Sequence, residues 1–226
     1  MSNAKQEAAM SALNVVPDSG AIGLGSGSTV AIFAKELGKK IREAQLDVKV
    51  VPSSYQAYQL AIRYSIPLTN LDLNPLLSTT IDGADEVDKN LNLTKGGGGA
   101  LFQEKIVASA SDEFHIVVDE SKLVDNLSTK SPIPIEVLPF SLGVVRRKIE
   151  AMDIEVDIRE AERKLGPVIT DNGNFILDLK FPKPIEDPGK IAIQLKLIPG
   201  IVETGLFVGM TTQVHVGTET HSYILE

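Results

Sequence analysis

The chain of 226 residues is 43% hydrophobic, which is enough to bury the core of one large domain or of two modest ones. It has a formal net charge of −8 and no cysteine. These values disfavour nucleic acid and anionic membranes as partners, and they exclude disulfides, thiolate zinc sites and cysteine nucleophiles. No apolar run reaches the length of a membrane span, and the N-terminus lacks the pattern of a signal peptide. We therefore expect a globular, cytoplasmic protein.

The first half of the chain alternates predicted helices and strands. An apolar period near 3.6 through Met10 and Val16 predicts an N-terminal helix that ends before Pro17. Strands are then expected at residues 21–24, 48–51, 114–118 and in a segment entering Asp82, and helices at residues 29–44, 55–64 and 100–111. This alternation is typical of an α/β fold, with a Rossmann-like, mostly parallel sheet flanked by helices.

The second half has a different order of elements. Strands are expected at 133–138, 154–158, 174–181 and 201–207, with helices at 141–152 and 188–197. This is the order of a smaller, α+β ferredoxin-like domain, and Asp171-Asn172-Gly173-Asn174 is a strong hairpin signal within it. Short strands at 213–216 and 222–225 should rejoin the first sheet. We expect a catalytic domain of residues 1–127 and 208–226 and a small domain of residues 128–207.

Two glycine-rich segments each lie between a predicted strand and a predicted helix. In the first loop, residues 23–29 (GLGSGST), free backbone N–H groups and the helix dipole favour an anion. The alternative is a turn that merely joins strand to helix, with Ser28 as N-cap. The second segment, KGGGG, forms residues 95–99, here called the glycine loop, and it precedes a helix that carries Glu104. A flexible linker is the alternative there, although linkers seldom separate core elements.

Charged residues follow two other predicted strands. Asp82 and Asp85 belong to the acidic segment 80–88, at a strand end where open α/β sheets bind ligands. They could accept hydrogen bonds from sugar hydroxyls, or the segment could be a solvated turn with Asp88 as an N-cap. A metal site would normally add a histidine or closer carboxylates, so no metal is expected. Lys122 follows strand 114–118 as a candidate anion anchor, or as a simple surface lysine.

In their order along the chain, GLGSGSTV, DGADEVD, KGGGGALFQEKI and DESK resemble the signatures of the type A ribose-5-phosphate isomerase family. The resemblance extends through PIEV, VITDNGN and PGIV, and so covers nearly the whole chain. The sequence departs from the family at Gly99, where alanine is frequent, and at residues 209–213, which lack the usual Ala-Asp.

The resemblance implies an aldose–ketose isomerase of the pentose phosphate pathway that interconverts D-ribose 5-phosphate and D-ribulose 5-phosphate. It implies Glu104 as general base, with Asp82, Asp85 and Lys95 also catalytic. It further implies a homo-oligomer, with a dimer favoured. The substrate-binding residues that it implies are Ser26, Gly27, Ser28, Thr29, Asp82, Gly83, Ala84, Asp85, Lys95, Gly96, Gly97, Gly98 and Lys122.

The chemistry of this reaction suits such a set. One carboxylate can remove the C2 proton and return it to C1 through a cis-enediolate, whose charge Lys95 and backbone N–H groups would stabilise. Whether Asp82 or Asp85 assists ring opening stays open. Because no electrons leave the substrate, we expect no cofactor.

Three other functions fit the sequence less well. A non-catalytic sugar-phosphate sensor on the same fold would not need Glu104 as a base. A deaminase or lactonase would need a water-activating residue that the sequence does not identify. A nucleotide-dependent oxidoreductase is disfavoured because Ser28 stands at the third glycine position of the dinucleotide fingerprint.

Overall fold

The computed structural model describes residues 3–163 and 165–226. Met1 and Ser2, which begin the N-terminal helical pattern, lie outside the described residues. The chain forms two compact units: unit 1 contains Met1–Ala84, Gln103–Lys122 and Met210–Glu226, and unit 2 contains Asp85–Phe102 and Leu123–Gly209. Segment 85–102 groups with unit 2, whereas the division expected from the sequence places it in the catalytic domain. That functional division stays a prediction.

Unit 1 contains a six-stranded sheet in the order β13-β12-β6-β3-β1-β2. All neighbouring strands are parallel except β12 and β13, which are antiparallel at one edge. The C-terminal strands therefore do rejoin the first sheet, as the sequence predicts. The strands are β1 (Ser19–Leu24), β2 (Asp47–Pro52), β3 (Leu77–Asp82), β6 (Ser111–Asp119), β12 (Gln213–Gly217) and β13 (Ser222–Leu225).

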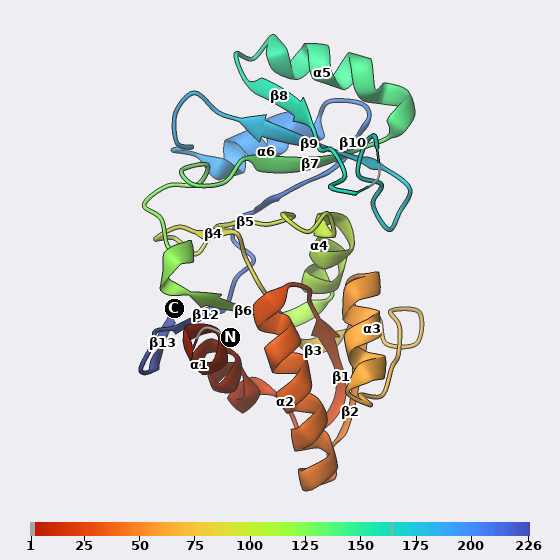
Figure 1. Cartoon of the computed structure of the whole chain (residues 1–226), viewed down its shortest axis with the longest axis vertical. Coiled ribbons are helices and arrows are strands. Elements are labelled where there is room, and N and C mark those ends of the chain that lie inside the picture. Colours follow the sequence, from red (N-terminus) through yellow and green to blue (C-terminus); the bar gives the residue numbers. More distant parts are fainter. Residues whose placement is uncertain (1–2, 164) are drawn as a thin grey trace. The chain divides into compact units, whose positions relative to one another are not determined.

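Helices cover both faces of this sheet. On one face α1 (Asn3–Ala12), α2 (Ser28–Ala44) and α3 (Tyr55–Arg63) lie side by side, against alternate strand residues such as Ile22 and Leu24 (Figure 1). On the other face Val107 of α4 (Leu101–Ser109) packs against Val51 and Leu77. Successive strand residues face opposite sides, which explains the continuous apolar runs of β1 and β6. Among the described residues, no helix is long and apolar enough to cross a membrane.

Unit 2 contains an antiparallel sheet in the order β10-β7-β9-β8. Its elements follow the order strand, helix, strand, strand, helix, strand that is predicted for a ferredoxin-like fold, so this part of the fold prediction is confirmed. Ile133, Ile135 and Val137 of β7 pack in one core with Val145 of α5 and Leu195 of α6. The elements are β7 (Ile133–Val137), α5 (Leu142–Glu150), β8 (Glu155–Ile158), β9 (Phe175–Lys180), α6 (Pro188–Lys196) and β10 (Ile201–Thr204).

A second, three-stranded sheet in unit 2 is not expected from the sequence. It joins β4 (Glu86–Val87), β5 (Leu93–Thr94) and β11 (Leu206–Phe207). The single strand predicted over residues 201–207 is wrong, because β10 ends at Thr204 and the chain pairs with β5 from Leu206 onwards. A Cβ at Gly205 would lie 2.3 Å from the carbonyl oxygen of Lys95, so this close crossing requires glycine. Strands of two residues are too short to give a period-2 signal.

Candidate active site

The carboxyl ends of the central strands of unit 1 meet at one edge of the sheet. Because β1, β3 and β6 are parallel, Leu24, Asp82 and Asp119 end their strands at the same edge. Open α/β sheets bind ligands at this edge, where the chain turns into loops that can adapt to a ligand. The structure thus places the first loop and Asp82 on the side of unit 1 that the sequence predicts.

The first loop is shaped around the buried carboxylate of Asp82. Oδ1 of Asp82 accepts hydrogen bonds from the backbone N–H groups of Ser26 (3.0 Å) and Gly83 (2.7 Å). At Gly25 a Cβ would lie 2.1 Å from Cγ of Asp82. Any side chain there would displace the carboxylate, so Gly25 is required for a close approach and not for loop flexibility.

The first loop leads directly into α2. Its N-cap is Gly27, with φ of 105°, so the alternative in which Ser28 caps the helix is wrong. Ser28 is the first helical residue and Thr29 is buried behind it. The amino end of a 17-residue helix provides N–H groups and a partial positive charge, a combination that favours an anion.

Two side chains that sequence reasoning missed contact this loop. Nζ of Lys5 in α1 donates to Oγ of Ser28 (2.9 Å), and Oε1 of Gln56 in α3 accepts from the backbone N–H of Gly27 (2.9 Å). Gln56 follows β2, whose carboxyl end lies at the same edge of the sheet, so parallel order could have suggested it. Nothing in the spacing of Lys5 pointed to the loop, because α1 reaches it only through helix packing.

Glu104 joins the same cluster from the first turn of α4. It is 5% exposed, and Oγ of Ser26 donates to its Oε1 at 2.5 Å. Ser26 therefore contacts two carboxylates, through its backbone N–H to Asp82 and through its hydroxyl to Glu104. The structure brings together three residues that the sequence singles out from segments 26–29, 82–85 and 104. Lys122 ends the 3₁₀ turn Glu120–Lys122 after β6 and is partly exposed.

In unit 2, Lys95 follows β5 at the beginning of the glycine loop. It is 2% exposed, its backbone N–H donates to the carbonyl of Gly205 (2.8 Å), and its Nζ lies 5.4 Å from the ring centroid of Phe207. An ammonium group at this distance over an aromatic face is stabilised by the ring quadrupole. Lysines are mostly exposed in folded proteins, so residue type alone does not predict that this side chain is buried in unit 2.

The glycine loop itself is ordered by contacts, so the linker alternative is wrong. Gly96 and Gly99 are buried and have φ of 104° and 76°, values that other residues rarely adopt. Between them, the backbone N–H of Gly97 donates to Oδ2 of Asp85 (2.7 Å), while Gly97 and Gly98 are exposed. The loop thus presents exposed backbone next to Asp85 and Lys95.

The remaining acids of the DGADEVD motif are structural. Glu86 is buried and accepts from Thr94 Oγ1 and from the backbone N–H groups of residues 128–131. Asp88 accepts from the backbone N–H groups of Asn90 and Asn92, so it closes a turn and does not cap a helix. Because both are buried, the alternative of a solvated acidic turn is wrong for this half of the motif.

A family model described as ribose 5-phosphate isomerase A (phosphoriboisomerase A) matches residues 49–221. The chain belongs to this family. It is 50% identical over 208 residues to ribose-5-phosphate isomerase A of Archaeoglobus fulgidus, covering 91% of each chain, and 46% identical over 215 residues to that of Pyrococcus horikoshii, covering 95% of this chain and 93% of the relative.

Solved structures of the ribose 5-phosphate isomerase A family agree with this fold along the chain. The enzyme of Methanocaldococcus jannaschii has a TM-score of 0.94 at 46% identity, covering 98% of this chain and 97% of that one. A D-ribose-5-phosphate isomerase in complex with phospho-erythronic acid has a TM-score of 0.95 at 45% identity, with the same coverage. A family member with a bound sugar-acid phosphate is therefore a close structural neighbour of this chain.

This member of the isomerase family holds the predicted residues in two sets, one in each unit. Unit 1 brings together Ser26, Asp82 and Glu104, and unit 2 brings together Asp85, Lys95 and Gly97. Within the described part of the chain, no group of three His, Asp or Glu side chains is arranged to hold a metal ion.

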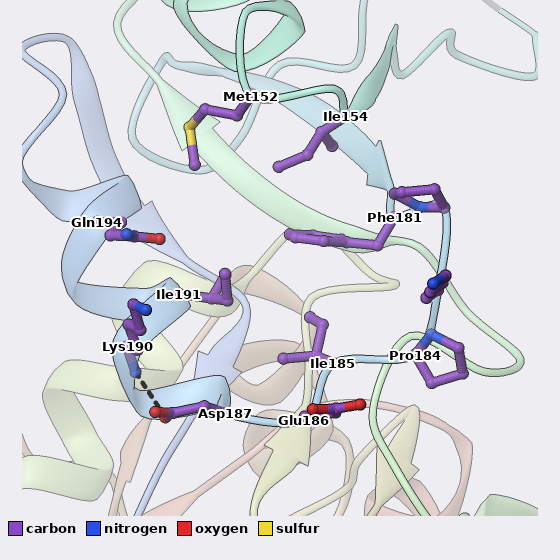
Figure 2. A pocket seen from close by; sticks show the side chains of 12 residues that line it. Met152, Ile154, Phe181, Pro184, Ile185, Glu186, Asp187, Lys190, Ile191 and Gln194 are labelled. Atoms are coloured by element: carbon purple, nitrogen blue, oxygen red, sulfur yellow. Dashed lines mark hydrogen bonds between the residues drawn. The ribbon is translucent and has the colours of Figure 1, made fainter.

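Unit 2 also has an open hollow that contains none of the predicted residues. It measures about 390 Å³, and the side chains of Phe181, Ile185 and Ile191 point into it (Figure 2). Its acids include Asp187, whose Oδ1 accepts from the backbone N–H of Lys190 (2.9 Å) and caps α6. Glu186 and Lys183 also line the hollow, which combines apolar side chains with a mixed charged rim and a helix cap.

Proposed function

We propose that this chain interconverts D-ribose 5-phosphate and D-ribulose 5-phosphate through a cis-enediolate, with Glu104 as the general base. One observation in this member of the isomerase family carries the assignment. The buried carboxylate of Glu104 accepts a hydrogen bond from the hydroxyl of Ser26, and the backbone N–H of Ser26 donates to Asp82. Fixed side chains of this kind keep a base in one orientation, which proton abstraction from carbon requires.

The proton transfers balance with one base. The carboxylate of Glu104 takes the C2 proton of the open-chain aldose, the C–H electron pair forms the C1=C2 bond, and the C1 carbonyl pair moves onto O1. The protonated Glu104 then returns the proton to C1 while O2 becomes the ketone oxygen and O1 ends as a hydroxyl. A single carboxylate on one face of a cis-enediolate performs both transfers.

The developing negative charge on the enediolate needs donors that are in place beforehand. In the proposal Lys95 and the backbone N–H of the exposed Gly98 supply them, because fixed N–H donors and an ammonium group stabilise an oxyanion without reorganisation. Asp82 or Asp85 assists ring opening and moves the proton between O1 and O2. Asp82 accepts hydrogen bonds from the backbone N–H groups of Ser26 and Gly83, and Asp85 accepts one from Gly97, so both carboxylates have a fixed orientation.

The residues proposed to bind the sugar phosphate come from the first loop, the acidic segment, the glycine loop and the turn that ends at Lys122. The amino end of α2 favours the dianionic phosphate. Lys5 adds an ammonium group 2.9 Å from Oγ of Ser28, and it joins the proposed set for that reason. The other proposed substrate-binding residues are Ser26, Gly27, Thr29, Asp82, Gly83, Ala84, Asp85, Lys95, Gly96, Gly97, Gly98 and Lys122.

The test compares wild type with Glu104→Gln in protein treated with EDTA, following ribulose 5-phosphate formation from ribose 5-phosphate. Glutamine keeps the acceptor for Ser26 but cannot take a proton, so we expect kcat to fall by about 10²- to 10⁴-fold. Glu43→Gln, an exposed acid on α2, is the matched control and should retain full activity. Full activity of Glu104→Gln would remove Glu104 from its role.

An inactive but folded wild type would favour the sugar-phosphate sensor. Calorimetry would then show binding of ribose 5-phosphate without turnover, and no base would be needed.

We further propose that the protein acts in the cytoplasm as a homo-oligomer, with a dimer favoured. The family resemblance and the absence of cysteine support this proposal. Light scattering coupled to size exclusion should give about twice the chain mass of 24.3 kDa, and a mass of one chain at micromolar concentration would contradict it.

A further inference from the structure

Arg159 of unit 2 contacts the glycine loop from a part of the chain that no motif marks. It directly follows β8, and its backbone is fixed on both sides: its N–H donates to Ile176 O (2.9 Å) and its carbonyl accepts from Val168 N–H (2.8 Å). Its side chain is 17% exposed. The guanidinium group therefore projects from a rigid strand end, and not from a mobile loop.

The carboxylate of Asp178 in β9 fixes the plane of this guanidinium. Nε of Arg159 donates to Oδ2 of Asp178 (2.8 Å) and Nη2 donates to Oδ1. Two parallel N–H···O bonds hold an arginine in one orientation, which a lysine cannot reproduce. With Nε and Nη2 occupied, the direction of Nη1 is determined as well.

Nη1 is directed at the glycine loop. It donates to the carbonyl oxygens of Gly96 (2.7 Å) and Gly97 (3.0 Å). These two carbonyls belong to successive peptide planes, so one nitrogen sets the orientation of both. The N–H of Gly97 lies on the opposite side of the first peptide plane and donates to Asp85, so this plane is hydrogen-bonded on both sides.

The second plane has a consequence for the reaction. In a trans peptide the N–H group points opposite to the carbonyl of the preceding residue. With the carbonyl of Gly97 held toward Arg159, the N–H of Gly98 must point away from Arg159, and Gly98 is exposed. Within the loop, the N–H of Gly99 donates to the carbonyl of Gly96 (2.9 Å) and closes a turn. Glycines have little intrinsic preference for either orientation of the peptide planes inside such a turn, and Arg159 adds the contact that orients the carbonyl of Gly97.

We propose that Arg159, oriented by Asp178, is a positioning residue for the isomerisation. It acts by orienting the peptide planes of Gly96 and Gly97 so that the N–H of Gly98 is preset as an oxyanion donor. This inference rests on the proposed role of the glycine loop in stabilising the enediolate. Arg159 itself does not touch the substrate in this scheme.

A second ion pair of unit 2 provides the contrast. Lys180 contacts Glu155 and Asp157, but its side chain is 52% exposed and it makes no bond to the glycine loop. Exposed pairs of this kind contribute little to stability. Lys180→Ala is therefore a matched control from the same sheet that removes a cation but leaves the glycine loop untouched.

The decisive variant is Arg159→Lys, which keeps the positive charge but loses the planar guanidinium and its paired hydrogen bonds to Asp178. We expect kcat to fall by about 10- to 100-fold, because a misplaced donor stabilises the enediolate-like transition state less well. The KM for ribose 5-phosphate should change by less than about threefold, because Arg159 does not touch the substrate. Asp178→Asn should give a smaller loss in the same direction, and Lys180→Ala should give none. Kinetics are measured well below the Tm of each variant, so that the folded fraction is complete.

Chemical rescue separates positioning from folding. Millimolar guanidinium should raise kcat of Arg159→Ala several-fold, and sodium chloride at the same ionic strength should not. A wild-type kcat in Arg159→Lys, with only a lower Tm, would overturn the inference and leave Arg159 a structural residue.

A failure of the proposed function would be seen separately, as an inactive wild type. The amide ¹⁵N–¹H resonances of Gly97 and Gly98 would then decide the inference, because they should shift in Arg159→Lys and stay in place in Lys180→Ala. Unchanged glycine resonances in Arg159→Lys would overturn it.

Discussion

The first loop in unit 1 and the glycine loop in unit 2 are both rich in glycine, and they use it for different reasons. In the first loop, Gly23 and Gly25 make room for side chains of β3: a Cβ at Gly23 would lie 1.9 Å from Oγ1 of Thr80, and one at Gly25 would lie 2.1 Å from the Asp82 carboxylate. In the glycine loop, Gly96 and Gly99 supply positive φ. Close approach to β3 is specific to the first loop, where Gly27 has a positive φ, whereas the glycine loop has two residues of positive φ and makes its own close approaches to Leu101 and Asp85.

The two loops also differ in what holds them. The first loop is held mainly by neighbouring secondary structure, since Asp82 ends the adjacent strand and α2 begins within the loop. The glycine loop is held by its own turn bond from Gly99 N–H to Gly96, by the carboxylate of Asp85, and by the guanidinium of Arg159, which lies 63 positions from Gly96. We therefore expect a substitution at Gly25 to disturb the first loop directly, and a substitution at Arg159 to disturb the glycine loop from another part of unit 2.

The largest effect should come from Gly25→Ala. Its Cβ would collide with the carboxylate that orders the loop, so either Asp82 or the backbone must move. We expect a destabilisation of about 3 kcal/mol or more and a loss of activity of at least about 100-fold. Urea denaturation followed by circular dichroism, together with the isomerase assay, measures both quantities.

Gly98→Ala is the control from the other loop. Gly98 has ordinary φ, and a Cβ there would meet no atom within 4 Å, so its free energy of unfolding should stay within about 0.5 kcal/mol of wild type. If Gly25→Ala were as stable as Gly98→Ala, glycine in the first loop would serve flexibility and the comparison would fail.

The comparison explains how far the sequence leads. Helix and strand periods predict the parallel sheet and the ferredoxin-like unit because each element buries one face over several residues, as Ile22 and Leu24 do in β1. The end of a parallel strand predicts Asp82 as a site residue, the family resemblance implies Glu104, and the structure joins both through Ser26.

What the sequence could not predict depends on pairs that are distant along the chain. Arg159 and Gly96 are separated by 63 positions, and a lone arginine in a polar segment is indistinguishable from a solvated one. Glu86 and Asp88 look like further ligands in the motif, yet they bind backbone N–H groups of their own unit. Composition and spacing report which residues are present, whereas partners are set by tertiary packing.

Acid should sharpen the contrast between the two units. In unit 1, Nε2 of the fully buried His215 lies 3.2 Å from Nδ1 of His115, and Nδ1 of His215 lies 2.8 Å from Oγ of Ser11. Nε2 of His115 lies 3.1 Å from a carboxylate oxygen of Glu113. Burial, and secondarily the charge on His115, lower the pKa of His215 from 6.5 to about 4. In unit 2, the hydrogen bond between the exposed side chains of Asp157 and Lys180 lowers the pKa of Asp157 and raises the pKa of Lys180.

The sign of the effect follows from the depressed pKa of His215. Above 6.5 the ring is neutral in both states; between 6.5 and about 4 the unfolded chain binds a proton that the folded chain does not, so stability falls as the pH falls. We expect His215 to contribute a loss on the order of 2 kcal/mol between about pH 7 and about pH 5. His215→Gln removes that titration, so its free energy of unfolding should decline less steeply over the same range, whatever its absolute value.

The exposed His221 provides the control, since His221→Gln should keep the wild-type slope. Hydrogen exchange assigns the loss to a unit: at about pH 5, amides of α1 and β12 should lose protection relative to about pH 7, while those of β7 and β9 keep theirs. An equal loss of protection in both sheets would mean that acid acts through the global charge of the protein. In that case the loss of stability in acid would not come from His115 and His215, the buried pair that lies between α1 and the six-stranded sheet.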